Sequence, residues 1–443
     1  MRTHTALIIL ACVCPSLLAQ VQYAPIRIPT NPAVSPAWFG ESFGVDGDEL
    51  YIGGLGSSPG LPNEPGGVYR FDKDTLTYQQ TYNPIGDPQE STFGYSMEYY
   101  DGVLLVGAIN DQSTGTFDIG AAHLINPTTG ALIHTFDESP NATLFSEFGI
   151  DVSINDVAIA IGAIGYDPSR SGQVFVYNAA TNSLVITLER DPGTIDTNYG
   201  YKVKHNDDYL IVSALGSRNA GIQGAIYVYD FVTGVRLHRF TSPVPDVDGT
   251  GQFGYDIELL GDRLFVGAGL AAPVGVLGRV TVYDLPTGNI ITTLSGNTTN
   301  DSDGFGSAIS AENSTLVVGA QYDNSFDGDN TGAVYVFDAD TYEMIDKVYP
   351  PLPTSDQVLF GRKVKVQDGT ILTSSLDKDQ FGERIGTAYI LRQFCRPDLN
   401  LDGNLNFFDV SFFLAQSVDW NQDGSFNFLD ISAFLQSFND GCP

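Results

Sequence analysis

The chain of 443 residues repeats itself seven times. Each repeat begins with an aromatic residue followed by glycine, and successive repeats begin 51 to 55 residues apart. Fourteen residues after each aromatic residue, an apolar run ends in two small residues, as at Gly107-Ala108 and Gly319-Ala320. The seven pairs are Phe39-Gly40, Phe93-Gly94, Phe148-Gly149, Tyr199-Gly200, Phe253-Gly254, Phe305-Gly306 and Phe360-Gly361. A period near fifty indicates one structural unit that packs against copies of itself.

Each repeat has the pattern of four short β-strands. In the second repeat, residues 93–99 and 103–106 flank an Asp-Gly turn. Residues 103–106 are continuously apolar, which is typical of a strand buried on both faces. Residues 120–125 and 132–136 follow, separated by a turn of sequence Asn-Pro-Thr-Thr-Gly. Four strands at this period describe one blade of a β-propeller, so we predict an all-β fold of seven four-stranded blades.

The seventh repeat has no fourth strand before Cys395. An incomplete blade would leave an open strand edge, which invites aggregation. Residues 24–28 precede the first aromatic-glycine pair by about the distance expected of a fourth strand. We therefore predict that they form the outer strand of the last blade and close the ring. A loose linker is the alternative, favoured by three prolines between residues 25 and 32, although an outermost strand tolerates proline.

The repeats resemble the FG-GAP repeats that also occur in integrin α-chains. The resemblance rests on the aromatic-glycine pairs and on third strands such as Gly-Ala-Val-Tyr-Val-Phe at 332–337. It covers about residues 39–393 and implies seven blades around a central channel. The proline of the family's Gly-Ala-Pro landmark is absent from all seven copies. Short turns such as 46–48 replace the integrin-type calcium loop, so the resemblance does not extend to calcium in the blades.

The start of the chain has the pattern of a secretory signal peptide, over residues 1–19. Arg2 precedes an apolar run from Ala6 to Leu18. A membrane anchor is the alternative, but the run is too short to span a bilayer comfortably. We therefore expect no membrane span and a secreted protein, either extracellular or attached to a cell surface. The propeller then occupies residues 20–393, and a third segment follows at 394–443.

The segment 394–443 contains two copies of an acidic motif, 21 residues apart. Oxygen-bearing residues alternate along each copy, with glycine at the sharp turn and a closing carboxylate, as in the EF-hand calcium loop. We predict two bound calcium ions. Asn404 and Ser425 would bind through their backbone carbonyls. The ligands of the first ion are Asp398, Asn400, Asp402, Asn404, Asn406 and Asp409, and those of the second are Asp419, Asn421, Asp423, Ser425, Asn427 and Asp430.

Aspartate at the closing position resembles dockerins, in which one helix follows each calcium loop. The resemblance implies a small α-helical, EF-hand-like module with helices at about 408–416 and 429–438. The Gly441-Cys442 ending is similar to Gly-Cys-tailed dockerin-like modules of bacterial secreted proteins. It also implies an anchoring partner, either cohesin-like or on a cell surface. Phe407-Phe408 and Phe428-Leu429 stand where dockerins often carry polar cohesin-binding residues.

Two of the four cysteines, Cys12 and Cys14, leave with the signal peptide. Cys395 and Cys442 remain and bracket the last fifty residues. Two cysteines in an exported chain usually pair, so we predict one disulfide between them.

The charge balance limits the classes of function. The chain has 21 Lys and Arg residues against 53 Asp and Glu, for a net charge of −32. Such a chain is no general nucleic-acid binder, because binding phosphates requires clustered Lys and Arg. The remaining histidines have no metal-binding spacing, and we expect them in strands or on the surface; they are His123, His134, His205 and His238. Acidic pairs are numerous, so a glycosidase dyad remains open.

The connections between second and third strands differ most from repeat to repeat, and we expect them on one face of the ring, where a glycan or protein ligand would bind. They are residues 57–65, 111–119, 167–171, 218–223, 270–277 and 322–331. The acidic stretch 323–330 is a weaker candidate for calcium, and 246–249 and 301–304 are of the same kind.

The sequence therefore predicts a secreted, non-catalytic binding or adhesion propeller that is anchored or assembled through a calcium-dependent module. An extracellular polysaccharide hydrolase or lyase on the same scaffold is one alternative, and a structural cell-surface component is another. An acidic pair in the channel beside aromatic rings would favour the enzyme. A channel lined by unlike polar residues would favour binding.

Overall fold

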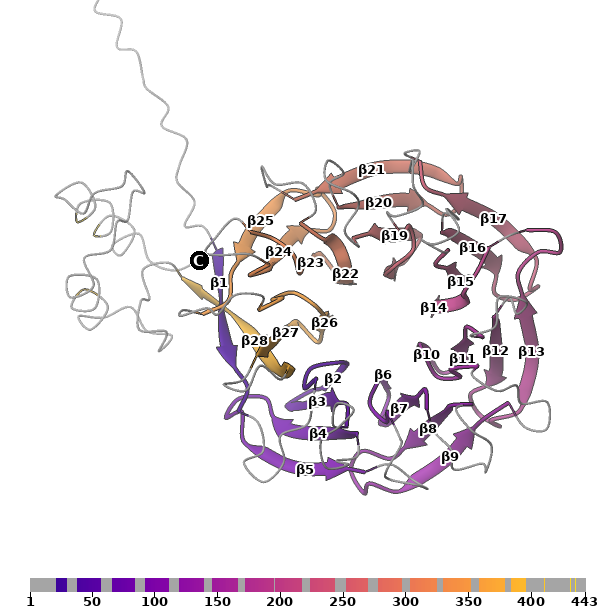
Figure 1. Ribbon diagram of the computed structural model, residues 1–443, viewed down its shortest axis with the longest axis horizontal. Coiled ribbons are helices and arrows are strands. Elements are labelled where there is room, and N and C mark those ends of the chain that lie inside the picture. Colours follow the sequence, from indigo (N-terminus) through magenta and orange to yellow (C-terminus); the bar gives the residue numbers. More distant parts are fainter. Residues whose placement is uncertain are drawn as a thin grey trace, which may run out of the picture. The chain divides into compact units, whose positions relative to one another are not determined.

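The computed structural model describes most of the repeat region. The described residues are 21–29, 38–56, 66–83, 92–110, 119–138, 146–165, 172–194, 196–216, 224–243, 252–269, 278–296, 303–324, 330–351, 358–378 and 384–395, with Val410, Ile431 and Leu435. Residues Pro25–Arg392 form one compact unit, which is the ring of blades in Figure 1.

The ring consists of seven four-stranded sheets, as predicted. Blade one contains β2 (Phe43–Asp46), β3 (Glu49–Gly54), β4 (Gly67–Asp72) and β5 (Tyr78–Tyr82); blade two β6 (Ser96–Tyr100), β7 (Val103–Ala108), β8 (Ala121–Ile125) and β9 (Leu132–Phe136); blade three β10 (Val152–Ile154), β11 (Ala158–Ala163), β12 (Gln173–Asn178) and β13 (Leu184–Glu189); blade four β14 (Tyr199–His205), β15 (Tyr209–Ala214), β16 (Ala225–Asp230) and β17 (Arg236–Thr241). Blade five contains β18 (Ile257–Leu260), β19 (Arg263–Ala268), β20 (Arg279–Asp284) and β21 (Asn289–Ser295); blade six β22 (Phe305–Glu312), β23 (Thr315–Ala320), β24 (Ala333–Asp338) and β25 (Met344–Val348); blade seven β26 (Val364–Gln367), β27 (Thr370–Lys378), β28 (Arg384–Cys395) and β1 (Val21–Arg27).

The four strands of blade two match their predicted positions closely, with one correction. β9 spans Leu132–Phe136 as predicted, but β6 begins at Ser96 and not at Phe93. Gly94 has a φ of 95°, and the N–H groups of Gly94 and Tyr95 both donate to the carbonyl of Gly107, at 3.1 and 3.2 Å. The aromatic-glycine pair therefore forms a turn at the entrance to the inner strand.

This turn is also where neighbouring blades meet. A Cβ atom on Gly107 of blade two would lie 2.1 Å from the carbonyl oxygen of Gly149 in blade three. Both residues belong to sequence landmarks of the repeat, so the constant offset of fourteen residues has a physical cause. The small residue ends the second strand of one blade, and the glycine of the next blade packs directly against it.

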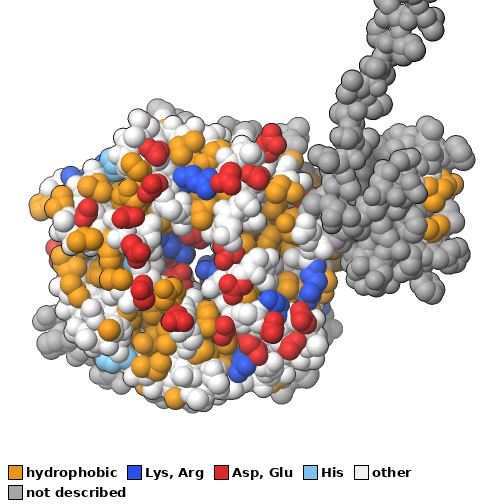
Figure 2. Space-filling model, turned by 180° about the vertical axis from the view of Figure 1, so that it is seen from behind, with side chains coloured by type: hydrophobic (Ala, Val, Ile, Leu, Met, Phe, Trp, Pro, Cys, Tyr) orange, Lys and Arg blue, Asp and Glu red, His pale blue; other side chains and the backbone are white. Residues whose placement is uncertain are grey.

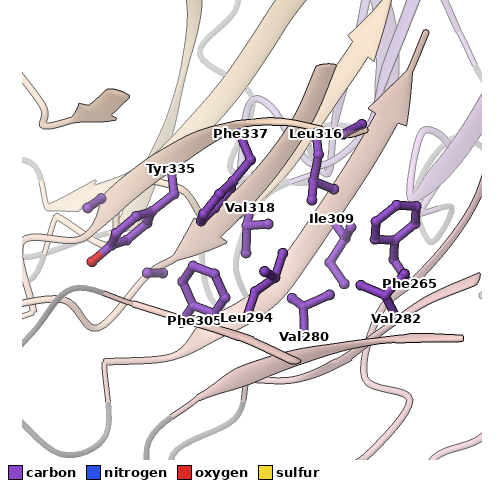
Figure 3. Packing of buried hydrophobic residues seen from close by; sticks show 13 residues of the cluster. Phe265, Val280, Val282, Leu294, Phe305, Ile309, Leu316, Val318, Tyr335 and Phe337 are labelled. Carbon is purple, nitrogen blue, oxygen red and sulfur yellow. The ribbon is translucent and has the colours of Figure 1, made fainter. Parts of the chain in front are cut away.

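Apolar cores lie between adjacent blades, and Figure 3 shows the one between blades five and six. The cluster contains Phe265 and Val280 of blade five and Phe305 and Tyr335 of blade six, and all four are buried. The ring of Phe305 packs edge-on against that of Tyr335, with centroids 5.1 Å apart. The aromatic residue that opens each repeat thus anchors its own blade within the shared core.

The N-terminal strand closes the ring, as predicted. β1 is the outer strand of blade seven, in the order β1-β28-β27-β26. Beyond its end, the Ile28 N–H donates to the carbonyl of Ala388 in β28 at 2.9 Å. Ile28 is fully buried in a cluster with Phe39 and Ile390. The ring therefore joins residues from both ends of the repeat region within one blade.

Several predicted features lie outside the described residues. These are the signal peptide at 1–19, both calcium loops at 398–409 and 419–430, the helices predicted with them apart from Val410, Ile431 and Leu435, and Cys442. β28 ends at Cys395, the other cysteine of the predicted disulfide. Within the described part of the chain, no helix is long and apolar enough to cross a membrane.

Replacing Ile28 by alanine tests the closure. We expect Ile28→Ala to cost about 2–5 kcal/mol of unfolding free energy, because it leaves a cavity in a fully buried cluster. Arg27→Ala is the matched control, since Arg27 is exposed, and it should change stability by about 0.5 kcal/mol or less. Urea unfolding followed by tryptophan fluorescence measures both. Equal midpoints for the two variants would contradict the closure.

Candidate functional site: the central channel

The inner strand of every blade has one edge that faces the channel. Polar side chains on these strands, and on the residues just before them, line two cavities of about 130 and 210 Å³. Figure 2 shows acidic and basic side chains together in the central hollow of the ring. We define the first layer as Glu41, Asp151, Lys202, Asp256, Arg362 and Lys363, and the second layer as Glu98, Lys204, Glu258 and Lys365.

On one side of the first layer, a lysine lies between two aspartates. The Nζ of Lys202 is 3.3 Å from Asp151 and 3.4 Å from Asp256. Burial lowers the pKa of Lys202, but the two carboxylates outweigh it, so the net pKa is raised and the ammonium remains charged. Each aspartate also accepts a main-chain N–H of the next blade, from Val203 at 2.9 Å and from Ile309 at 2.7 Å. Each of these carboxylates therefore pairs with a cation and also accepts a hydrogen bond from the inner strand of the next blade.

On the other side of the first layer, one carboxylate holds two cations. Glu41 lies 2.7 Å from Arg362 and 3.0 Å from Lys363, and 2% of its side chain is exposed. Burial raises the pKa of Glu41, but Arg362 and Lys363 together outweigh it, so the net pKa lies below the ordinary value. Burial lowers the pKa of Lys363, and the charges of Arg362 and Lys202 lower it further against the opposing effect of Glu41.

The second layer repeats the first arrangement with glutamates. Lys204 is 3.9 Å from both Glu98 and Glu258. Burial raises the pKa of Glu258 above its ordinary value, with Lys204 opposing. For Glu98 the same burial effect is outweighed by Lys204 and Lys365, and its pKa is lowered. Glu98 also accepts the N–H of Ile154 in the next blade at 3.1 Å.

Neutral side chains bond inner strands in the same way. The Ser310 hydroxyl accepts the N–H of Val366 at 3.0 Å, and Gln367 accepts that of Val45 at 3.1 Å. The free edge of an inner strand would otherwise carry unpaired N–H groups, which are costly when buried. The polar lining of the channel is therefore part of the structure of the ring.

Three tyrosines accompany the first layer: Tyr95, Tyr201 and Tyr255. The rings of Tyr201 and Tyr255 lie 5.8 Å apart, and Lys363 lies 6.0 Å from the ring centre of Tyr95. Burial raises the pKa of Tyr201 well above its ordinary value, so its hydroxyl stays protonated. The channel thus combines both features weighed from the sequence, acidic pairs beside aromatic rings and a lining of unlike polar groups.

The histidines lie in strands, as expected. His123 is in β8, His134 in β9, His205 in β14 and His238 in β17. Within the described ranges, no three His, Cys, Asp or Glu residues are grouped so as to hold a metal ion.

The acidic stretches are described only in part, because 246–249 and most of 323–330 lie outside the described residues. Asp323 accepts the hydroxyl of Tyr335 and lies 2.9 Å from Lys347. Asp303 accepts the N–H of Phe305 at 3.0 Å. Both carboxylates thus make structural contacts inside blade six. The strand connections proposed as a ligand face are also outside the described residues, apart from short ends such as 322–324.

The sequence analysis missed the channel residues. A signal was present, because five of the 21 basic residues lie on or just before two inner strands, in the runs Lys202-Val203-Lys204 and Arg362-Lys363-Val364-Lys365. Charged residues that alternate along a strand normally indicate a face exposed to solvent. Here they lie at the inner edges of their blades.

Comparison with known proteins bears on the repeat. Residues 292–337 match the model of the FG-GAP repeat. The ring carries an FG-GAP repeat. The matched range begins in β21 and ends in β24, so it covers the end of one blade and three strands of the next. The FG-GAP repeat is thus offset from the blade, which is the arrangement that lets β1 complete blade seven.

The search of curated proteins finds no match. Among solved structures, one titled "Structure of U3-55K" is similar, with a TM-score of 0.50 and 11% identity over 84% of this chain and 98% of that chain. At this identity the likeness shows a shared fold alone.

Replacing Glu41 by glutamine tests the first layer. We expect Glu41→Gln to lower the unfolding free energy at pH 7 by about 3–5 kcal/mol, because it leaves two buried cations uncompensated. The pKa of Glu41 is lowered by folding, so its contribution is complete well above pH 4.5 and is lost as the pH falls through the folded-state pKa. The difference between wild type and variant should therefore shrink on acidification below about pH 4.5.

The matched control is Glu49→Gln, which breaks the pair with Arg70 on blade one, where both side chains are 21% exposed. It should cost about 1 kcal/mol or less. Denaturant unfolding between pH 3.5 and 7 measures both variants. An equal cost for the two, or a difference for Glu41→Gln that does not depend on pH, would contradict the argument.

Proposed function

We propose that the protein is a secreted binding or adhesion propeller that does not catalyse a reaction. The main support for this proposal is that carboxylates lining the channel already form ion pairs within the protein. Glu41, Asp151 and Asp256 each lie within 3.4 Å of a Lys or Arg, and the two aspartates also accept a main-chain N–H. General acid–base catalysis needs a carboxyl group that can exchange its proton with a substrate. These groups hold the blades together instead.

The ligand-binding face is proposed to be the one that carries the long connections. Strands within a blade run antiparallel, so the second-to-third connections leave from the same face as the connections between blades. The opposite face has tight turns closed by their own side chains. In blade two, Asn126 accepts the N–H groups of Thr128 and Thr129, at 3.0 and 2.9 Å. In blade six, Asp338 accepts the N–H of Thr341 at 2.7 Å. Regular turns leave less scope for recognition than connections that vary.

With a net charge of −32, the ligand is proposed to be a neutral glycan or a basic protein surface. The dockerin-like segment at 394–443 would bind two calcium ions and attach the propeller to a cohesin-like or other cell-surface partner. A disulfide between Cys395 and Cys442 would clasp the two ends of that segment, which is too short for a large core.

A polysaccharide-acting enzyme is the second candidate. The observation that favours it is Glu258, whose pKa is raised by burial, in a channel that also contains Tyr201 and Tyr255. A raised pKa is what a carboxyl group needs to act as a general acid near neutral pH.

Binding and turnover separate these functions. We expect the mature protein, residues 20–443, to bind members of a glycan and protein array and to release no product from polysaccharides. Ligand binding should survive Glu258→Gln, because Glu258 lies in the channel and not on the proposed face. Turnover that survives chelation and is abolished by Glu258→Gln would overturn the proposal in favour of the enzyme. An array without any binder would favour the structural role.

Calcium uptake tests the C-terminal segment. We expect calorimetry on the mature protein to count two ions per chain, because the sequence supplies two complete loops. Replacing Asp398 and Asp402 by alanine should remove one ion, and replacing Asp419 and Asp423 should remove the other. The control replaces Asp246 and Asp248 in the propeller and should keep both. No uptake at millimolar calcium, or loss of an ion in the control, would contradict this assignment.

A further inference from the structure

The two sides of the channel carry opposite excess charge. On the side of blade seven, β26 contributes Lys365, and the residues just before it contribute Arg362 and Lys363. Glu41 of blade one is the carboxylate that pairs with Arg362 and Lys363. We call this group the basic wall. Figure 1 shows β26 across the channel from β10 and β14. The other side carries more carboxylates than cations, and we call it the acidic wall: Glu98, Asp151, Asp256 and Glu258, with Lys202 and Lys204.

The second layer holds two glutamates and two lysines, but its ion pairing is incomplete. No described carboxylate lies within 4.0 Å of the Lys365 ammonium, although both Glu98 and Glu258 are close enough for their pKa values to be lowered by its charge. Lys365 and the two glutamates line the same cavity. The cavity of about 210 Å³ lies here, lined by Lys204, Lys365, Glu98 and Glu258 with the hydroxyls of Ser153 and Ser310. That volume exceeds the space of a single water many times over.

A third carboxylate that lines this cavity is already bonded elsewhere. Glu312 of blade six accepts the N–H groups of Asp368 and Gly369 at 3.0 and 2.9 Å. Its carboxylate is thus held at the hairpin turn of blade seven and not against Lys365.

We propose that this cavity binds a small zwitterion, with its carboxylate at Lys365 and its ammonium at Glu98 and Glu258. A simple anion fits less well, because a protein of net charge −32 repels it on approach. A simple cation fits less well, because it would add a third positive charge beside Lys204 and Lys365 and bring no carboxylate to offset it. A zwitterion has no net charge to be repelled, and each of its ends finds the opposite charge. This site is in the channel and is independent of the ligand face proposed above.

Three matched probes test the assignment: 4-aminobutanoate, butanoate and butylamine. Titration calorimetry of the mature protein at pH 7 and low salt should show 4-aminobutanoate binding about tenfold or more tightly than either singly charged analogue, since one charge-assisted contact is lost with each. Lys365→Met should reduce the affinity for the zwitterion to that for butylamine. Glu258→Gln should reduce it toward that for butanoate.

The control is Lys73→Met, on a surface turn of blade one where its ammonium contacts the carbonyl of Gly47; it should leave the affinity unchanged. Lys365→Met should melt somewhat below the wild-type temperature, because the Lys365 charge also stabilises the carboxylates of Glu98 and Glu258, so its affinity is measured well below that temperature. Equal affinity for butanoate and 4-aminobutanoate would overturn the zwitterion in favour of an anion. Equal affinity for butylamine, unchanged binding in Lys365→Met, or no binding at millimolar concentration would also overturn the proposal.

Discussion

The ring depends on close contact between the glycine of each aromatic-glycine pair and a small residue of the preceding blade. The contact recurs at all seven boundaries. It pairs Gly53 with Gly94, Gly107 with Gly149, Gly162 with Gly200, Ser213 with Gly254, Gly267 with Gly306, Gly319 with Gly361 and Ser374 with Gly40. The glycine carbonyl approaches so closely that most of these positions have no room for a side chain. The last pair joins blade seven to blade one, so the same contact closes the ring.

This close packing of the blades determines which hydrogen bonds the inner strands can make. Their free edges meet around the channel, where carboxylates and hydroxyls of the preceding blade accept their N–H groups. Once carboxylates are buried there, each needs a cation, because an unpaired buried charge is costly. Lys202, Lys204 and Arg362 meet that need. The charges of the channel are therefore first a consequence of the fold. They become available for recognition where the pairing is incomplete, as at Lys365.

The sequence analysis predicted the strands because their causes are local. The continuous apolar run of β7 and the turn before β9 are readable within a few residues. It also predicted that the N-terminal strand completes blade seven, because an incomplete sheet is costly wherever it occurs. It placed the start of β6 three residues too early, since the turn at Gly94 is stabilised by the carbonyl of Gly107 on the neighbouring strand. The charged lining of the channel was missed because the ion pairs there join residues that are far apart in the sequence, such as Glu41 and Arg362.

By itself, the sequence determined the number of blades, their four strands and the way the ring closes. A constant offset between two landmarks, repeated seven times, allows few other folds. The tertiary structure alone decided that carboxylates of other blades line the channel together with five basic residues, Lys202, Lys204, Arg362, Lys363 and Lys365. The physical reason is that strand periodicity specifies which faces of a blade are buried, whereas a channel is formed from inner edges. The residues that surround an inner strand edge come from other blades, so they are determined only when the seven blades assemble into the ring.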